Sequence, residues 1–129
     1  MSGTASYPLD AAYVPKALYY ENADSLEYVR RDSPNVYRRI DQHLTLILDL
    51  HSREPLGFSL KGFRHLYLTK VLPKHTAQPV SFFKLINILE DAMSVHANAL
   101  FEQEERRRAY KDALEIAAED DVILDRIAM

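Results

Sequence analysis

Cysteine and tryptophan are both missing from this 129-residue chain, and glycine occurs only three times. The lack of cysteine excludes disulfides, thiolate catalysis and metal sites built from cysteine sulfur. The glycines (Gly3, Gly57 and Gly62) are too few and too scattered for a loop that cradles nucleotide phosphates. The chain also has no His-Glu-x-x-His run and no Gly-x-Ser-x-Gly nucleophile motif. These absences favour a non-enzymatic protein, for which we expect no cofactor.

Long apolar runs are absent as well. Charged residues interrupt every apolar stretch before it reaches the roughly 20 residues that span a bilayer. Residues 1–15 lack the basic and apolar segments of a secretory signal, and their two prolines and one glycine predict a flexible arm. We therefore expect a cytoplasmic protein with no membrane contact.

Charge and pattern divide the rest of the chain into two segments. Residues 1–79 contain ten Lys/Arg and eight Asp/Glu, whereas residues 80–129 contain six and eleven. The sign of the net charge therefore changes where the pattern changes from strand to helix. We expect a β segment with its connection over 16–79, and a closely coupled helical segment over 80–129.

Alternating residues predict the β segment. Leucine recurs at every second position from Leu44 to Leu50, and a second alternating run follows the turn after it. Period-two alternation on both sides of a short turn is typical of a β-hairpin with one buried face. Strands are expected near 17–20 or 25–31, 36–41, 43–50 and 56–61. The Asp32-Ser33-Pro34-Asn35 turn predicts a hairpin between the earlier strands, and hence an antiparallel meander of about four strands.

Helical spacing predicts the second segment. No proline or glycine occurs after Pro79, and apolar residues recur at intervals of three and four. One helix of fifty residues would be about 75 Å long, too long for so small a fold to cover. We expect breaks near Asn98 and residues 119–121, and helices near 82–98, 100–118 and 121–127. The alternative is one continuous helix that protrudes and binds a partner.

Residues 62–79 fit more than one structure. Alternation over 65–70 would suit a strand, and a short helix ended by Pro73 would suit the same residues. We favour an extended or irregular connection. With the helices packed on the meander, the predicted fold class is α+β.

The β segment resembles a family of small bacterial domains of unknown function. The resemblance covers residues 17–62 and is carried by the strings YYENADSLEYV, ILDLH and LGFSL. Tyr20 departs from the family pattern, which usually has Asp there, and Pro55 replaces the usual glycine-rich turn. The resemblance implies a β-meander and no activity, so it transfers no functional residue.

His43, Asp49 and His51 are the candidate chemical residues of the β segment. They alternate with the leucines and so share one face of a strand. Residues two apart lie about 7 Å apart on that face, close enough for Asp49 and His51 to share a metal ion or a proton. The solvated face of a half-buried strand also collects such polar residues by itself. A small metal protein or enzyme is therefore the second alternative function.

Four arginines flank the Asp32–Asn35 turn: Arg30, Arg31, Arg38 and Arg39. Pairing of the flanking strands would bring them together, and a basic β-ribbon can contact the phosphates of a nucleic acid. Glu27, Asp32 and Asp41 are interleaved with them and reduce the positive charge. Nucleic-acid binding is the first alternative function.

Apolar residues left over in the tail predict self-association. Because a helix over 82–98 can cover the leucine face of the sheet, the later apolar side chains must either fold back onto the second face of the sheet or pair with another subunit, and we favour the second. The predicted interface consists of Tyr110, Leu114, Ile116, Ile123, Leu124 and Ile127. The favoured function is a non-enzymatic interaction or regulatory module that forms a homodimer, or binds a protein partner, through its C-terminal helices.

Overall fold

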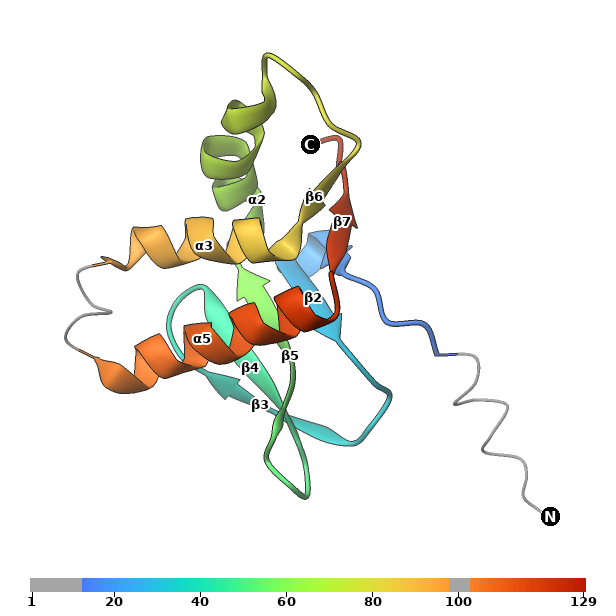
Figure 1. Cartoon of the computed structure of the whole chain (residues 1–129), viewed down its shortest axis with the longest axis vertical. Helices are drawn as coiled ribbons and strands as arrows, with labels where there is room; N and C mark the ends of the chain where they lie inside the picture. The colour runs from blue at the N-terminus through green and yellow to red at the C-terminus, as the bar shows by residue number, and fades with distance from the viewer. Residues whose placement is uncertain (1–12, 98–102) are drawn as a thin grey trace.

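The computed structural model describes residues 13–97 and 103–129, and it confirms an α+β fold with an antiparallel sheet before the two longer helices (Figure 1). The predicted arm falls mainly, and the predicted break near Asn98 entirely, outside the described residues. The strands are β1 (Leu18–Tyr20), β2 (Ser25–Val29), β3 (Asn35–Arg39), β4 (Leu44–Asp49), β5 (Pro55–Lys61), β6 (Phe82–Lys84) and β7 (Ile123–Asp125). The helical segments are η2 (Glu21–Ala23), α2 (Phe63–Leu66), η3 (Tyr67–Val71), η4 (Leu72–His75), α3 (Leu85–Val95) and α5 (Glu104–Glu119). None of the helices in the described part of the chain is long and apolar enough to cross a membrane.

The order of strands in the main sheet is β1-β2-β5-β4-β3, so a simple meander was the wrong prediction. The β4–β5 hairpin forms as predicted, but β2 pairs with β5 and not with β3. The Asp32–Asn35 turn therefore belongs to a connection that crosses the end of the β4–β5 hairpin. Its ends are fixed on opposite sides of that hairpin, because Arg30 donates to the Leu56 carbonyl and Leu50 donates to the Pro34 carbonyl.

The sheet is strongly curled. Strands β2 and β3 would lie roughly 14 Å apart in a flat sheet, yet the Tyr37 hydroxyl of β3 donates a hydrogen bond to Glu27 of β2 (3.0 Å). Gly57 permits the close approach of β5 to β2, since a Cβ there would lie 1.9 Å from the Tyr28 carbonyl oxygen.

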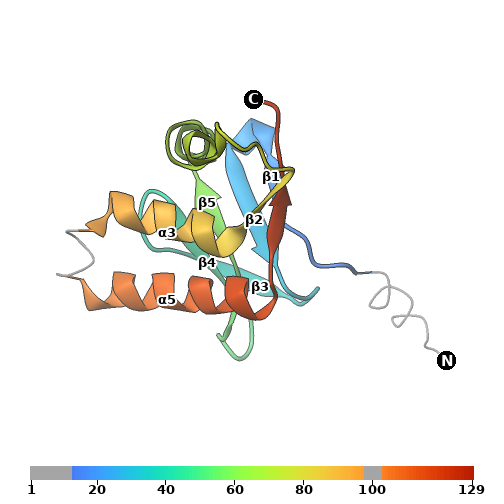
Figure 2. The same ribbon diagram turned by 45° about the horizontal axis from the view of Figure 1, so that its top comes forward.

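Helices α3 and α5 lie side by side on one face of the sheet (Figure 2). The prediction that one helix would cover this face was wrong, because the sheet is wider than a single helix. Five strands make a sheet roughly 20 Å wide, and a helix with its side chains is only about 10 Å wide. The tail therefore folds onto its own sheet, and the largest fully buried side chains of the core include Phe58, Leu89 and Tyr110.

Residues after α5 form a strand and not the predicted third helix. Asp121 adopts a left-handed conformation (φ 47°), and the Val122 and Asp121 N–H groups bond to the carbonyls of Ala117 and Ala118. This arrangement is a Schellman motif, which ends a helix by satisfying its last carbonyl groups. Strand β7 then pairs with β6, a strand that the sequence pattern had placed within a helix.

Residues 63–75 are helical, so the extended connection was also a wrong prediction. The alternative of a short helix ending near Pro73 was closer. The side chains of Phe63, Leu66, Tyr67 and Val71 are buried at helical spacing. That spacing outweighs the alternation that suggested a strand.

Candidate functional site

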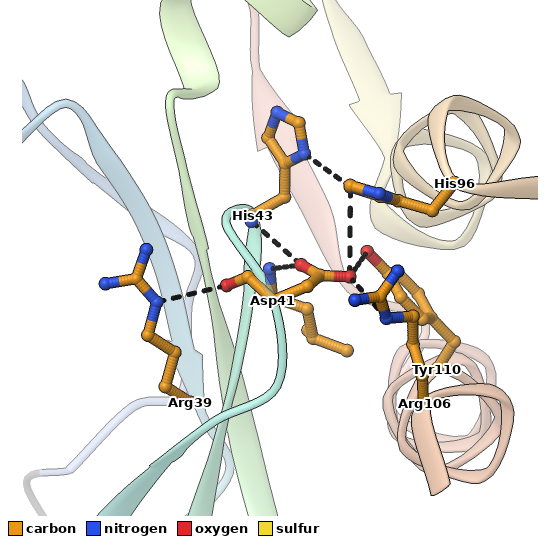
Figure 3. Close-up of polar contacts among 7 residues, drawn as sticks. Arg39, Asp41, His43, His96, Arg106 and Tyr110 are labelled. Carbon is orange, nitrogen blue, oxygen red and sulfur yellow. Dashed lines mark hydrogen bonds and ion pairs between the residues drawn. The ribbon is translucent and has the colours of Figure 1, made fainter. Parts of the chain in front are cut away.

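One polar cluster joins the β3–β4 turn to both long helices (Figure 3). Asp41 and His43 belong to the turn, His96 directly follows α3, and Arg106 and Tyr110 belong to α5. Arg106 and Tyr110 are four residues apart, so both project from the same face of α5 toward the turn. The cluster therefore forms where three segments that are distant in the sequence meet.

Asp41 is the centre of the cluster, and only 2% of its side chain is exposed. Its Oδ1 atom accepts hydrogen bonds from the backbone N–H groups of His43 and Leu44, each at 2.8 Å. Its Oδ2 atom accepts a hydrogen bond from the Tyr110 hydroxyl at 2.9 Å. Burial alone would raise the pKa of Asp41, but these three hydrogen bonds outweigh it and hold the pKa below its ordinary value. The carboxylate is therefore charged at neutral pH.

His43 and His96 form a close imidazole pair. The His43 Nδ1 and His96 Nε2 atoms are 2.8 Å apart, so one nitrogen donates a proton to the lone pair of the other. Burial lowers the pKa of His43, and the neighbouring His96 lowers it further. A neutral His43 is the form that can offer a lone pair to a ligand.

Arg106 contributes a guanidinium cation whose hydrogen-bond donors are not all used within the cluster. Its Nε atom is buried and has no hydrogen-bond partner among the described residues. The Asp41 Oδ2 atom lies 3.6 Å from it, close enough for charge attraction and too far for a good hydrogen bond. Burial and the nearby Asp41 carboxylate both raise the pKa of the Tyr110 hydroxyl, which stays protonated as a donor.

Asp41, His43 and His96 can also be considered as metal ligands. One ligand atom from each of the three lies within 4.8 Å of the other two. Tetrahedral zinc with bonds of 2.0–2.1 Å places its ligand atoms roughly 3.3 Å apart. The two nitrogens are 2.8 Å apart, and the His96 Nε2 atom is 3.8 Å from Asp41 Oδ2. These two distances are each about 0.5 Å from the required one, and the third pair of ligand atoms, from His43 and Asp41, lies within 4.8 Å.

The structure separates the residues that sequence reasoning had combined. His43 lies just before β4, whereas Asp49 ends that strand, roughly 20 Å away at the spacing of an extended chain. The Asp49 Oδ1 atom accepts the N–H groups of His51 and Ser52, both at 2.9 Å, and so shapes the exposed turn. The structure therefore does not bring His43 together with Asp49 and His51, and only His43 belongs to the observed cluster.

The four arginines do not form one basic patch, because β5 and β4 lie between the strands that carry them. Arg30 makes ion pairs with Asp120 (2.7 Å) and Glu119 (3.1 Å). Arg31 is 3.7 Å from Asp49, Arg38 makes an ion pair with Glu105, and Arg39 donates to the Asp41 carbonyl. Acidic or carbonyl partners within the chain therefore occupy all four, and the geometry does not favour a nucleic-acid interface.

The predicted helical interface is mostly internal. Tyr110, Ile116 and Leu124 are buried in the chain's own core, and Leu114 and Ile127 pack against it. Ile123 alone of the six is well exposed, at 43%. These side chains bury the apolar surface that had suggested a second copy.

Sequence reasoning missed Asp41, His96, Arg106 and Tyr110 as members of one site. The Asp-Gln-His spacing of residues 41–43 was a visible local signal, since an Asp at a strand start can bond to the backbone two residues later. No local signal could connect this turn to His96, which lies 53 residues after His43.

No protein-family model, curated protein or solved structure matches this chain.

Proposed function

We propose that this protein binds a divalent transition-metal ion, of the kind represented by Zn2+, through Asp41, His43 and His96. The observation that carries the proposal is the approach of three ligand atoms, from three side chains, to within 4.8 Å of one another. Two imidazoles and one carboxylate form a donor set that suits zinc, iron, nickel or copper better than calcium or magnesium. Three protein ligands would leave one coordination position open.

The surroundings of the ligands support this proposal. The Asp41 carboxylate is charged, and His43 is held toward its neutral form, so neither group has to lose a proton at neutral pH. The two hydrogen bonds from the β3–β4 turn to Asp41 Oδ1 fix the carboxylate and leave Oδ2 directed toward His96. Such outer contacts orient a ligand before the metal binds.

Binding requires two small changes. The His96 Nε2 atom must move about 0.5 Å away from His43 Nδ1 and about 0.5 Å toward Asp41 Oδ2 to reach tetrahedral spacing. The nitrogen that carries the shared proton must also give it up, and a neutral imidazole does so by moving the proton to its other ring nitrogen. Both changes are local, because His96 follows the end of α3.

Arg106 is expected to lower the affinity of the site for a metal ion. Its guanidinium lies 3.6 Å from the same carboxylate oxygen that would bind the metal, so the two cations compete for one anion. We therefore expect a moderate metal affinity that rises when this positive charge is removed.

Equilibrium dialysis against Zn2+ tests the proposal with the full-length protein. We expect one zinc ion per chain, and loss of binding in His43→Ala, His96→Ala and the more conservative His96→Gln. His51→Ala is the matched control, because this exposed histidine belongs to the β4–β5 turn and should not affect binding. Far-UV circular dichroism checks that each variant is folded. The proposal is wrong if the natural protein binds no zinc, or if folded His96→Gln binds it as well as the natural protein.

A further inference from the structure

Strand β3 is an outer strand of the main sheet, and among the residues that the structure describes it pairs with β4 alone. In an antiparallel ladder, residue pairs that exchange backbone hydrogen bonds alternate with pairs that do not. Leu50 donates to the Pro34 carbonyl, and Ile40 donates to the Leu44 carbonyl. The even-numbered residues from 34 to 40 therefore direct their backbone groups toward β4.

The backbone N–H and C=O groups of Asn35, Tyr37 and Arg39 consequently face away from the sheet. None of these groups has a hydrogen-bond partner among residues 13–97 and 103–129. Tyr37, at the middle of the strand, is 57% exposed. Helix α5 packs mainly over β4 and β5, and its first turn reaches β3 through the ion pair between Glu105 and Arg38.

The opposite edge of the sheet is protected in a way that β3 is not. Strand β1 has three residues, and η2 follows it directly. A short edge strand offers few groups to a neighbouring chain, whereas the five residues of β3, four of them exposed, offer a template for pairing.

We propose that two copies of this chain associate through their β3 strands, which pair antiparallel about a two-fold axis at Tyr37. This register places Tyr37 opposite the partner copy's same residue and Asn35 opposite Arg39. It allows about six backbone hydrogen bonds between the copies, two for each outward-facing pair. The main sheets of the two copies would then be continuous.

Overlap and charge together select this register over its neighbours. A shift by two residues in either direction shortens the overlap of the two strands, and one of these shifts also sets Arg38 opposite Arg38. In the register centred on Tyr37, Arg38 lies opposite Val36, and each Arg38 already makes an ion pair with Glu105 of its own chain. A second copy is therefore a self-complementary occupant of this edge.

Light scattering across a concentration series tests the proposal, with a chelator present so that metal binding cannot contribute. We expect the mass to rise from 14.9 kDa toward twice that value as the concentration increases. Tyr37→Pro removes an outward N–H without removing a bond of the β3–β4 ladder, and should shift the curve strongly toward monomer. Tyr37→Phe is the matched control, because it keeps the backbone and should still dimerise.

Amide hydrogen exchange on the natural protein gives a readout that needs no variant. The N–H groups of Tyr37 and Arg39 should become protected as the concentration rises, while those of exposed turns such as Ser52 should not change. A mass that stays at the monomer value throughout the series overturns the proposal. A dimer in which Tyr37 and Arg39 exchange at the monomer rate also overturns it, because its interface must lie elsewhere.

Discussion

Replacement of Asp41 by Asn is the substitution that most directly tests the architecture of the polar cluster. Asn has the same shape, and its carbonyl oxygen can still accept the backbone N–H groups of His43 and Leu44. Its amide nitrogen, however, cannot accept the hydrogen bond from Tyr110, and Arg106 loses its nearest anion. A hydrogen bond to a charged group contributes about 1.5–3 kcal/mol. Because the Asp41 side chain is 2% exposed, its ion pair is less screened than a surface pair. We expect Asp41→Asn to lower the free energy of unfolding by about 2–4 kcal/mol.

Urea denaturation followed by far-UV circular dichroism measures this loss, provided that the metal is removed by a chelator. A loss of that size lowers the melting temperature by roughly 10 °C in a chain of this length. Asp49→Asn is the matched control, because Asp49 forms the same backbone contacts at the other end of β4 without a buried hydroxyl or cation. Its effect should be much smaller. Equal effects of the two substitutions would refute the conclusion that Asp41 joins the turn to α5.

Three further substitutions test separate parts of the structure. Arg106→Met should tighten Zn2+ binding, because it removes the competing cation; calorimetry that shows unchanged or weaker binding contradicts this. Hydrogen bonds from Arg30 and Tyr28 hold the pKa of Asp120 below its ordinary value. The charged Asp120 therefore stabilises the fold at pH values above the ordinary pKa of an aspartate, and this contribution is lost as the pH falls through the lowered pKa. Asp120→Asn should therefore flatten the acid limb of stability against pH, and an unchanged limb counts against the pairing. Gly57→Ala should cost about 3 kcal/mol or more in urea denaturation, since its Cβ would meet the Tyr28 carbonyl; a neutral result would exclude the close β2–β5 approach.

The β4–β5 hairpin could be predicted because its information is local. Alternating leucines and a short turn define both strands, and the observed bounds, 44–49 and 55–61, differ from the predicted ones by one residue. The Asp32–Asn35 turn is also local, but its sequence does not determine which strand lies beside β2. That choice depends on Gly57, whose missing side chain lets β2 approach β5.

Local sequence predicts the two long helices but not how they pack or where α5 ends. Their apolar spacing predicts α3 and α5, yet the width of the sheet decides that both pack on one face. The prediction of a helical dimer interface followed from an estimate of four strands and one covering helix. The end of α5 is fixed by the left-handed Asp121, which the sequence marks only as part of an acidic run.

The polar cluster could not be assembled from sequence for the same reason. His43 and Asp41 are neighbours whose contact is local, whereas His96 and Tyr110 reach them only after two helices have packed on the sheet. His96 follows the apolar residues of α3 in the sequence, and none of its sequence neighbours indicates a contact with a second histidine.

The visible absorption spectrum of the protein with Co2+ tests the metal-binding function most directly. A four-coordinate site of two imidazoles and a carboxylate gives Co2+ much stronger visible bands than hydrated Co2+ has, and Zn2+ should abolish them by competition. We predict these bands for the natural protein and for His51→Ala, and their absence from His43→Ala and His96→Gln. A natural protein that leaves the spectrum of hydrated Co2+ unchanged, or bands that persist in folded His96→Gln, would contradict the assignment of Asp41, His43 and His96 as a metal site.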